Sequence, residues 1–274
     1  MKFIHYLDNN ISRIGVIKDN KIFRTNYNDL EELFDIDLKD IKLLDEETNN
    51  IKVLPIIEKP KQDILCLGMN YYKHKNECLN AGFDNDPHAN TVYFSKRCNK
   101  AITSNDYINL HKDITKEVDY EGELGLILKK DSYKLETDED IYNSIFGYCI
   151  INDVSARDLQ KEHQQFLFGK SLDTFTSISE VLVTVDELGI KPELDIKTYV
   201  NDELRQDDNT RNMMFNIPYF LKELTKGITL EKGTIIATGT PSGIGKSMSK
   251  FLKDKDVVRI EIEKIGTLIN KCME

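Results

Sequence analysis

Short apolar runs separated by polar residues are the main pattern of the chain from residue 63 onward. Their length and their content of Val, Ile, Tyr and Phe are typical of β-strands. We expect strands at residues 64–67, 92–94, 124–128, 145–151, 181–185, 196–200, 235–237 and 257–262. So many short strands indicate an α+β, β-rich fold with a sandwich or barrel-like core.

Helical signals are fewer. They are clearest at residues 155–165 and 218–225. Ser155 and Asp158 have the spacing of a capping box, so we expect the first of these helices to begin at Ser155. A tight turn is expected within residues 199–203, because its Asn-Asp pair tolerates positive φ.

The first 57 residues form a separate block of short elements. Strands are expected at 2–6, 11–17 and 22–24, and Asn28 is expected to cap a helical stretch at 30–34. An extended connector with two prolines follows. We therefore predict a small N-terminal α+β domain at residues 1–57 and a larger domain at residues 58–274.

Charge and cysteine content exclude several classes of protein. The chain of 274 residues has 37 Lys and Arg against 47 Asp and Glu, a formal charge of −10. No basic cluster interrupts this acidity, so neither nucleic acid nor a membrane surface is expected as a partner. No segment has the length of a membrane span or the apolar core of a secretory signal, which predicts a cytoplasmic protein. Five scattered cysteines without a C-x-x-C pair predict reduced thiols.

Three acidic residues at strand ends predict a cation site. Residues two apart in a strand project from the same face, so Glu121 and Glu123 lie together, with Asp119 beside them. Asp153 follows the strand expected at 145–151. If Asp153 converges with the two glutamates, the all-oxygen set suits Mg²⁺ or Mn²⁺ better than zinc. The alternative is a solvated edge of a hairpin.

Two further motifs carry candidate chemistry. His74 and Glu77 share a face if their segment is helical, and a carboxylate bonded to an imidazole makes a general base. The glycine-rich loop at 237–247 ends in Gly-Lys-Ser, as a phosphate loop does, but Thr240 stands where that loop needs its first glycine. A nucleotide-binding protein is therefore a remote alternative.

Taken in order, five motifs resemble the fumarylacetoacetate hydrolase superfamily, in its branch of acylpyruvate hydrolases and hydroxyhepta-diene-dioate isomerases. The resemblance runs from about Lys61 to the C-terminus. The motifs are residues 68–71 with His74 and Glu77, residues 119–124, 152–160, 169–175 and 237–243.

The resemblance implies a catalytic domain of mixed β-sandwich or β-roll type, a small N-terminal domain and a homodimer. It also implies a divalent metal, usually Mg²⁺ with Mn²⁺ or Ca²⁺ as alternatives. The residues that it assigns are Glu121, Glu123 and Asp153 as metal ligands, His74 and Glu77 as the water-activating dyad, Lys170 as a catalytic contact, and Gln160, Thr240, Lys96 and Asn70 as substrate contacts.

This combination predicts a hydrolase that cleaves a C–C bond in a 2,4-diketo acid of the acylpyruvate or fumarylpyruvate type. His74, oriented by Glu77, would deprotonate the attacking water, and the metal would stabilise the negative charge of the enolate that leaves. The substrate is a small anionic 2-oxo acid. The alternatives are decarboxylation or tautomerisation of oxaloacetate-like or 2-hydroxy-diene-dioate acids, which form the same enolate without an attacking water.

Overall fold

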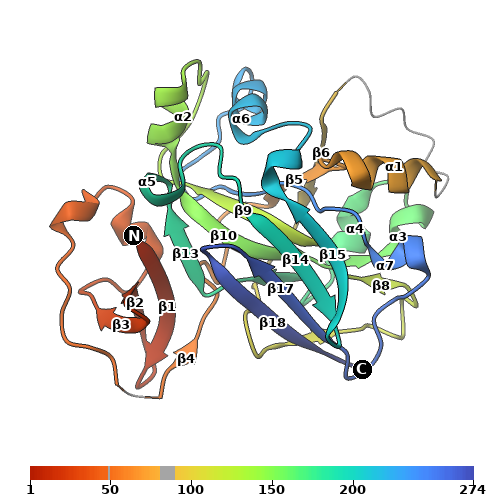
Figure 1. Cartoon of the computed structure of the whole chain (residues 1–274), viewed down its shortest axis with the longest axis horizontal. Helices are drawn as coiled ribbons and strands as arrows, with labels where there is room; N and C mark the ends of the chain where they lie inside the picture. The colour runs from red at the N-terminus through yellow and green to blue at the C-terminus, as the bar shows by residue number, and fades with distance from the viewer. Residues whose placement is uncertain (49, 81–89) are drawn as a thin grey trace.

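Two packed β-sheets form the frame of the molecule, and the N-terminal strands extend one of them (Figure 1). The computed structural model describes residues 1–48, 50–80 and 90–274, with the side chains of all of these except 78–80. This arrangement confirms the prediction of a β-rich α+β fold.

Eleven strands make up the larger sheet within the described ranges, in the order β3-β2-β1-β13-β10-β9-β16-β5-β6, with β12 on β10 and β4 on β1. Their bounds are β1 Lys2–Asp8, β2 Ile11–Lys18, β3 Lys21–Arg24, β4 Lys52–Val53, β5 Ile64–Gly68, β6 Val92–Lys96, β9 Gly122–Leu128, β10 Ile145–Asp153, β12 Thr176–Ile178, β13 Val181–Thr184 and β16 Ile235–Ala237.

The second sheet has the order β15-β14-β17-β18-β7, and β8 pairs with β11 as a short separate ladder. Their bounds are β7 Tyr107–Asn109, β8 Val118–Asp119, β11 Ser155–Ala156, β14 Asp195–Val200, β15 Glu203–Asn209, β17 Val257–Ile262 and β18 Gly266–Met273.

Short helices close the ends of the sheets, and α1, α3, α4 and α7 gather at one end, beside β8 (Figure 1). The α-helices are α1 Tyr72–Asn80, α2 Asp138–Ser144, α3 Arg157–Glu162, α4 Phe166–Lys170, α5 Val185–Leu188, α6 Ile217–Thr225 and α7 Gly245–Met248, and the 3₁₀ helices are η1 Leu30–Leu33, η2 Leu38–Asp40 and η3 Thr210–Asn212.

The two central strands of the larger sheet, β9 and β10, are buried along their whole length. Alternate side chains explain this, because each face of the strands meets a different hydrophobic cluster. Leu126 and Ile150 belong to the core shared with the second sheet. Ile127 and Ile151 belong to the core shared with the N-terminal block. Both faces of these strands are therefore covered.

The N-terminal block is joined to the larger sheet through backbone hydrogen bonds. Strand β1 pairs antiparallel with β13, with Phe3 opposite Leu182. Phe3 also stacks on Phe146 of β10, with ring centroids 5.9 Å apart. The sheet and its core thus continue across residue 57, and the two-domain division at that residue stays a prediction.

The apolar runs predicted as strands all form strands, and the hairpin at 199–203 is confirmed. Asn201 and Asp202 have φ of 50° and 65°, as a tight turn between β14 and β15 requires. The run at 181–185 is a strand only to Thr184, because Val185 begins α5.

Two predicted helix starts were wrong. Asp29, and not Asn28, accepts the amide of Glu31 at the start of η1. Ser155 lies in β11 and donates to the carbonyl of Asp153, so α3 begins at Arg157 without a side-chain cap.

The predicted capping partner, Asp158, points elsewhere. It accepts hydrogen bonds from Thr115 Oγ1 at 2.5 Å and from the amide of Lys116 at 2.9 Å. The helix expected at 155–165 also ends at Glu162, and α4 follows as a separate element.

The cysteines that the structure describes are unpaired, and their reduced state stays a prediction. Cys66, Cys98, Cys149 and Cys272 are free thiols, whereas the side chain of Cys78 lies outside the described residues. Among the helices of the described ranges, none is both long and apolar enough to span a membrane.

We predict that Gly147→Ala destabilises the protein by about 2 kcal/mol, the cost of overpacking a rigid site. An added Cβ would lie 2.5 Å from the carbonyl oxygen of Val183 and 3.0 Å from the Cα of Thr184, so β10 and β13 would have to separate. Gly227→Ala is the matched control, because no atom lies within 4 Å of its added Cβ. Urea denaturation of both variants tests this, and equal stabilities would contradict it.

Candidate metal centre and catalytic dyad

Glu121, Glu123 and Asp153 converge at the ends of two paired strands. One carboxylate oxygen from each lies within 4.8 Å of the others, and all three residues are buried. The pairing of β9 with β10 explains the convergence, since Ile151 is opposite Glu123 and the amide of Asp153 donates to the carbonyl of Glu121 at 2.9 Å. Opposite residues of an antiparallel pair share a face. The predicted trio is therefore a cluster in space.

Two buried lysines contact this cluster. Lys170 Nζ, from the end of α4, lies 2.5 Å from Glu121 Oε2 and 2.6 Å from Asp153 Oδ2. Lys96 Nζ, from the end of β6, lies 2.6 Å from Asp153 Oδ1 and also donates to the carbonyl of Val154. Burial lowers the pKa of Lys170, but Asp153 and Glu121 outweigh it, so the net pKa is raised and the ammonium stays charged.

Glu123 is the carboxylate on which repulsion by its two acidic neighbours has the largest effect. Its Oε2 accepts the amide of Gly239 at 2.7 Å. Burial and then the charges of Asp153 and Glu121 raise its pKa well above the ordinary value of a glutamate. A buried set of oxygen donors with excess negative charge fits a hard divalent cation. The donor chemistry therefore matches the metal that the resemblance implied.

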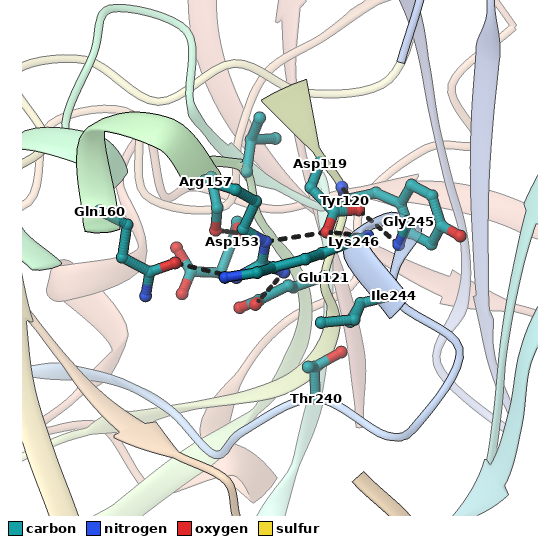
Figure 2. A network of polar contacts seen from close by, with 12 residues as sticks. Asp119, Tyr120, Glu121, Asp153, Arg157, Gln160, Thr240, Ile244, Gly245 and Lys246 are labelled. Atoms are coloured by element: carbon teal, nitrogen blue, oxygen red, sulfur yellow. Dashed lines mark hydrogen bonds and ion pairs between the residues drawn. The ribbon is translucent and has the colours of Figure 1, made fainter. Parts of the chain in front are cut away.

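A buried arginine adds a third positive charge to the site and contacts two of its carboxylates (Figure 2). Arg157 Nη2 lies 2.6 Å from Glu121 Oε1, and its Nε donates to Asp119 Oδ2 at 2.8 Å. Burial raises the pKa of Glu121, but Lys170 and Arg157 outweigh it, so the net pKa is well below the ordinary range. Arg157 had no predicted role, although it stands in the motif at 152–160. The site thus contains four buried acidic side chains and three buried basic ones, which leaves one formal negative charge. The acidic residues are Asp119, Glu121, Glu123 and Asp153, and the basic residues are Lys96, Arg157 and Lys170.

His74 and Glu77 form the predicted pair on α1. His74 Nδ1 lies 2.9 Å from Glu77 Oε2. Burial raises the pKa of Glu77, but hydrogen bonds from His74, Ser247 and the amide of Gly243 outweigh it, and the net pKa is lowered. An ionised carboxylate only accepts, so Nδ1 carries a proton, and Nε2 is the ring atom that can gain or lose one. In its protonated form His74 also helps to lower the pKa of Glu121, so its charge acts on the cluster.

The residues predicted as substrate contacts are tied into the structure around the site. Asn70 Nδ2 donates hydrogen bonds to the carbonyls of Phe215 and Thr238, and Asn70 Oδ1 accepts one from the amide of Phe215. Thr240 Oγ1 donates to the carbonyl of Gly122 at 2.9 Å, and Gln160 Oε1 accepts from Arg157 Nη1 at 3.2 Å. In these contacts they act as braces, and their contact with substrate stays a prediction.

The glycine-rich loop does not present a phosphate cradle. The amide of Gly243 donates to Glu77, and the amides of Gly245 and Lys246 donate to Asp119. These donors already serve carboxylates of the chain, whereas a phosphate loop directs its amides at the nucleotide. The loop is therefore a structural part of the acidic site.

A family model described as fumarylacetoacetate (FAA) hydrolase C-terminal matches residues 63–273. The chain belongs to the fumarylacetoacetate hydrolase family. Oxaloacetate tautomerase YisK of Bacillus subtilis (strain 168) is 41% identical over 225 residues, which are 81% of this chain and 73% of that protein.

Solved structures of the fumarylacetoacetate hydrolase family show the same fold. One is a fumarylacetoacetate hydrolase (EaFAH) from psychrophilic Exiguobacterium antarcticum, with 35% identity and a TM-score of 0.86 over 100% of this chain and 99% of that chain. Another is a 5-carboxymethyl-2-hydroxymuconate delta-isomerase from Mycobacterium smegmatis, with 25% identity and a TM-score of 0.79 over 100% and 98%. The protein is therefore an enzyme of this family, whose relatives include hydrolases, isomerases and a tautomerase.

We predict that Glu77→Gln lowers the free energy of unfolding by about 1 kcal/mol near neutral pH, because charge-assisted hydrogen bonds become neutral ones. The folded state lowers the pKa of Glu77, so this stabilisation is present above the unfolded pKa of about 4.3 and is lost as the pH falls through the folded value. The difference from wild type should shrink in urea denaturation at about pH 4. Glu162→Gln, at an exposed position at the end of α3, is the control and should change stability little. If the stability difference between Glu77→Gln and wild type did not depend on pH, ionised Glu77 would not be the source of this stabilisation.

Proposed function

We propose that the protein interconverts the keto and enol forms of a small 2-oxo dicarboxylate of the oxaloacetate type, with Mg²⁺ or Mn²⁺ held by Glu121, Glu123 and Asp153. The observation that carries this is a carboxylate-oriented imidazole within electrostatic reach of a buried oxygen-donor trio. The 41% identical tautomerase supports this reaction over others that begin with the same enolate.

The reaction needs a proton removed beside a carbonyl and negative charge stabilised on its oxygen. When bound, a divalent cation would supply that stabilisation as a Lewis acid. His74 Nε2 would accept the proton from the substrate carbon, while the C–H electrons form the enolate double bond. The imidazolium, held by Glu77, would then return a proton to the enolate oxygen. Lys170 and Arg157 would attract the carboxylates of the substrate.

Hydrolytic cleavage of a 2,4-diketo acid is the second candidate. The same dyad could take a proton from water, and the relative from Exiguobacterium antarcticum carries the hydrolase name. A decarboxylase would need the cation site without a base. One assay separates the three reactions: loss of enol absorbance with oxaloacetate, pyruvate release from acylpyruvates, and CO₂ release from oxaloacetate, each with Mg²⁺ and with a chelator. Tautomerisation should be the fastest.

We predict that Glu123→Gln abolishes metal-dependent turnover and weakens Mn²⁺ binding in calorimetry at least about 100-fold, because a charged oxygen ligand is lost. The variant should unfold at an equal or higher temperature in chelator, since the substitution removes a repelled buried charge and keeps an acceptor for the amide of Gly239. Glu139→Gln, at an exposed position of α2, is the control and should behave as wild type. Unchanged Mn²⁺ affinity in Glu123→Gln would refute the metal site.

We predict that His74→Asn lowers kcat for tautomerisation by about 100-fold or more, the usual contribution of a positioned general base. Mn²⁺ affinity should change little, because His74 is not one of the oxygen ligands. Any CO₂ release from oxaloacetate should persist, since loss of CO₂ needs the cation and no base. Retained tautomerase activity would exclude His74 as the base.

A further inference from the structure

Asp119 is a fully buried carboxylate outside the metal trio, and it has four hydrogen-bond donors around it. Its Oδ1 accepts the amides of Gly245 at 2.7 Å and Tyr120 at 2.9 Å. Its Oδ2 accepts Arg157 Nε at 2.8 Å and the amide of Lys246 at 3.0 Å. Figure 2 shows Asp119 between Arg157 and the Gly245–Lys246 backbone. The carboxylate therefore joins two separate parts of the site.

The first part is the segment 243–247, which two carboxylates hold together. Asp119 binds it at Gly245 and Lys246, at the start of α7. Glu77 binds its two ends, through the amide of Gly243 at 3.0 Å and through the hydroxyl of Ser247. The dyad partner of His74 is thus oriented by a segment that Asp119 anchors.

Close packing makes this segment rigid. Gly243 has a φ of +103°, and a Cβ there would lie 1.9 Å from the carbonyl oxygen of Arg205. A Cβ at Gly245 would lie 2.6 Å from Asp119 Oδ1 and 2.5 Å from the carbonyl oxygen of Lys250. Glycine is required at both positions for this approach. We therefore expect a shift at one anchor to move the whole segment.

The second part is the metal ligand Glu121. Arg157 bonds Asp119 through Nε and pairs with Glu121 through Nη2. A planar guanidinium fixes the relative positions of the carboxylates that bind it. The chain of contacts therefore runs from Glu77 through the segment 243–247 to Asp119, Arg157 and Glu121.

We infer that Asp119 is a positioning residue that couples the orientation of the His74–Glu77 dyad to the metal ligand Glu121. The inference rests on the proposed function only for its catalytic consequence. The coupling itself is between hydrogen bonds that are present in the substrate-free protein, so it can be measured without any substrate.

Amide hydrogen exchange of the full-length protein tests the coupling. In Asp119→Asn, exchange at Gly245 and Lys246 should accelerate about tenfold or more, because their charged acceptor is gone. If the two anchors are coupled, exchange should also accelerate at the amide of Gly243, which donates to Glu77 and not to Asp119. The reciprocal variant Glu77→Gln should accelerate exchange at Gly245 and Lys246, and it keeps the test decisive if Asp119→Asn does not fold.

Asp158→Asn is the matched control. Asp158 follows Arg157 on α3 and also accepts main-chain amides, but its partners are Thr115, Lys116 and Leu159. Exchange at Gly243 should be unchanged in this variant. If each anchor variant accelerates only the amides that it bonds directly, the coupling is refuted and Asp119 is a local brace.

A double-mutant cycle in kcat at saturating Mg²⁺ provides the catalytic readout. If Asp119 acts through the dyad, the variant with both Asp119→Asn and Glu77→Gln should lose about as much activity as Glu77→Gln alone. Losses that multiply would show that the residues act independently and would overturn the catalytic part of the inference. If the protein turns over none of the tested 2-oxo acids, the proposed function fails, while hydrogen exchange still decides the coupling.

Discussion

Repulsion among three buried carboxylates is the constraint around which this site is organised. Glu121, Glu123 and Asp153 lie too close together, and too far from water, to be ionised without cations beside them. Lys170 and Arg157 neutralise part of this charge at hydrogen-bonding distance, and the remaining repulsion is concentrated on Glu123, whose pKa is raised. The same excess charge that makes the site costly to fold makes it attractive to a hard divalent cation.

The fold can tolerate this repulsion because the site stands at the end of two strands that are buried along their whole length. Strands β9 and β10 have a hydrophobic core on each face, so their ends are held firmly where the carboxylates project. Helices α3 and α4 then bring Arg157 and Lys170 to the cluster from outside the sheet. Binding strength in such a site comes from preorganised charge, since the ligands do not have to be gathered when the cation arrives.

The dyad and the cation site are separate in sequence but share one support. Glu77 reaches the segment 243–247 from α1, and Asp119 reaches it from β8. An enzyme that removes a proton beside a carbonyl uses a base and a charge acceptor together, so the separation between them has to be held fixed.

Patterns within one element were readable from the sequence: the apolar strand runs, the turn at Asn201-Asp202, the glutamates two apart and the His74–Glu77 pair. Backbone periodicity sets these spacings, so neighbours in the sequence suffice. Strand β18 was missed although it alternates, and so was the part played by Arg157. Ser155 and Asp158 matched a capping box and yet found other partners. Only the tertiary structure decides which elements face each other, because strand register and buried charge pairing depend on packing summed over the whole chain.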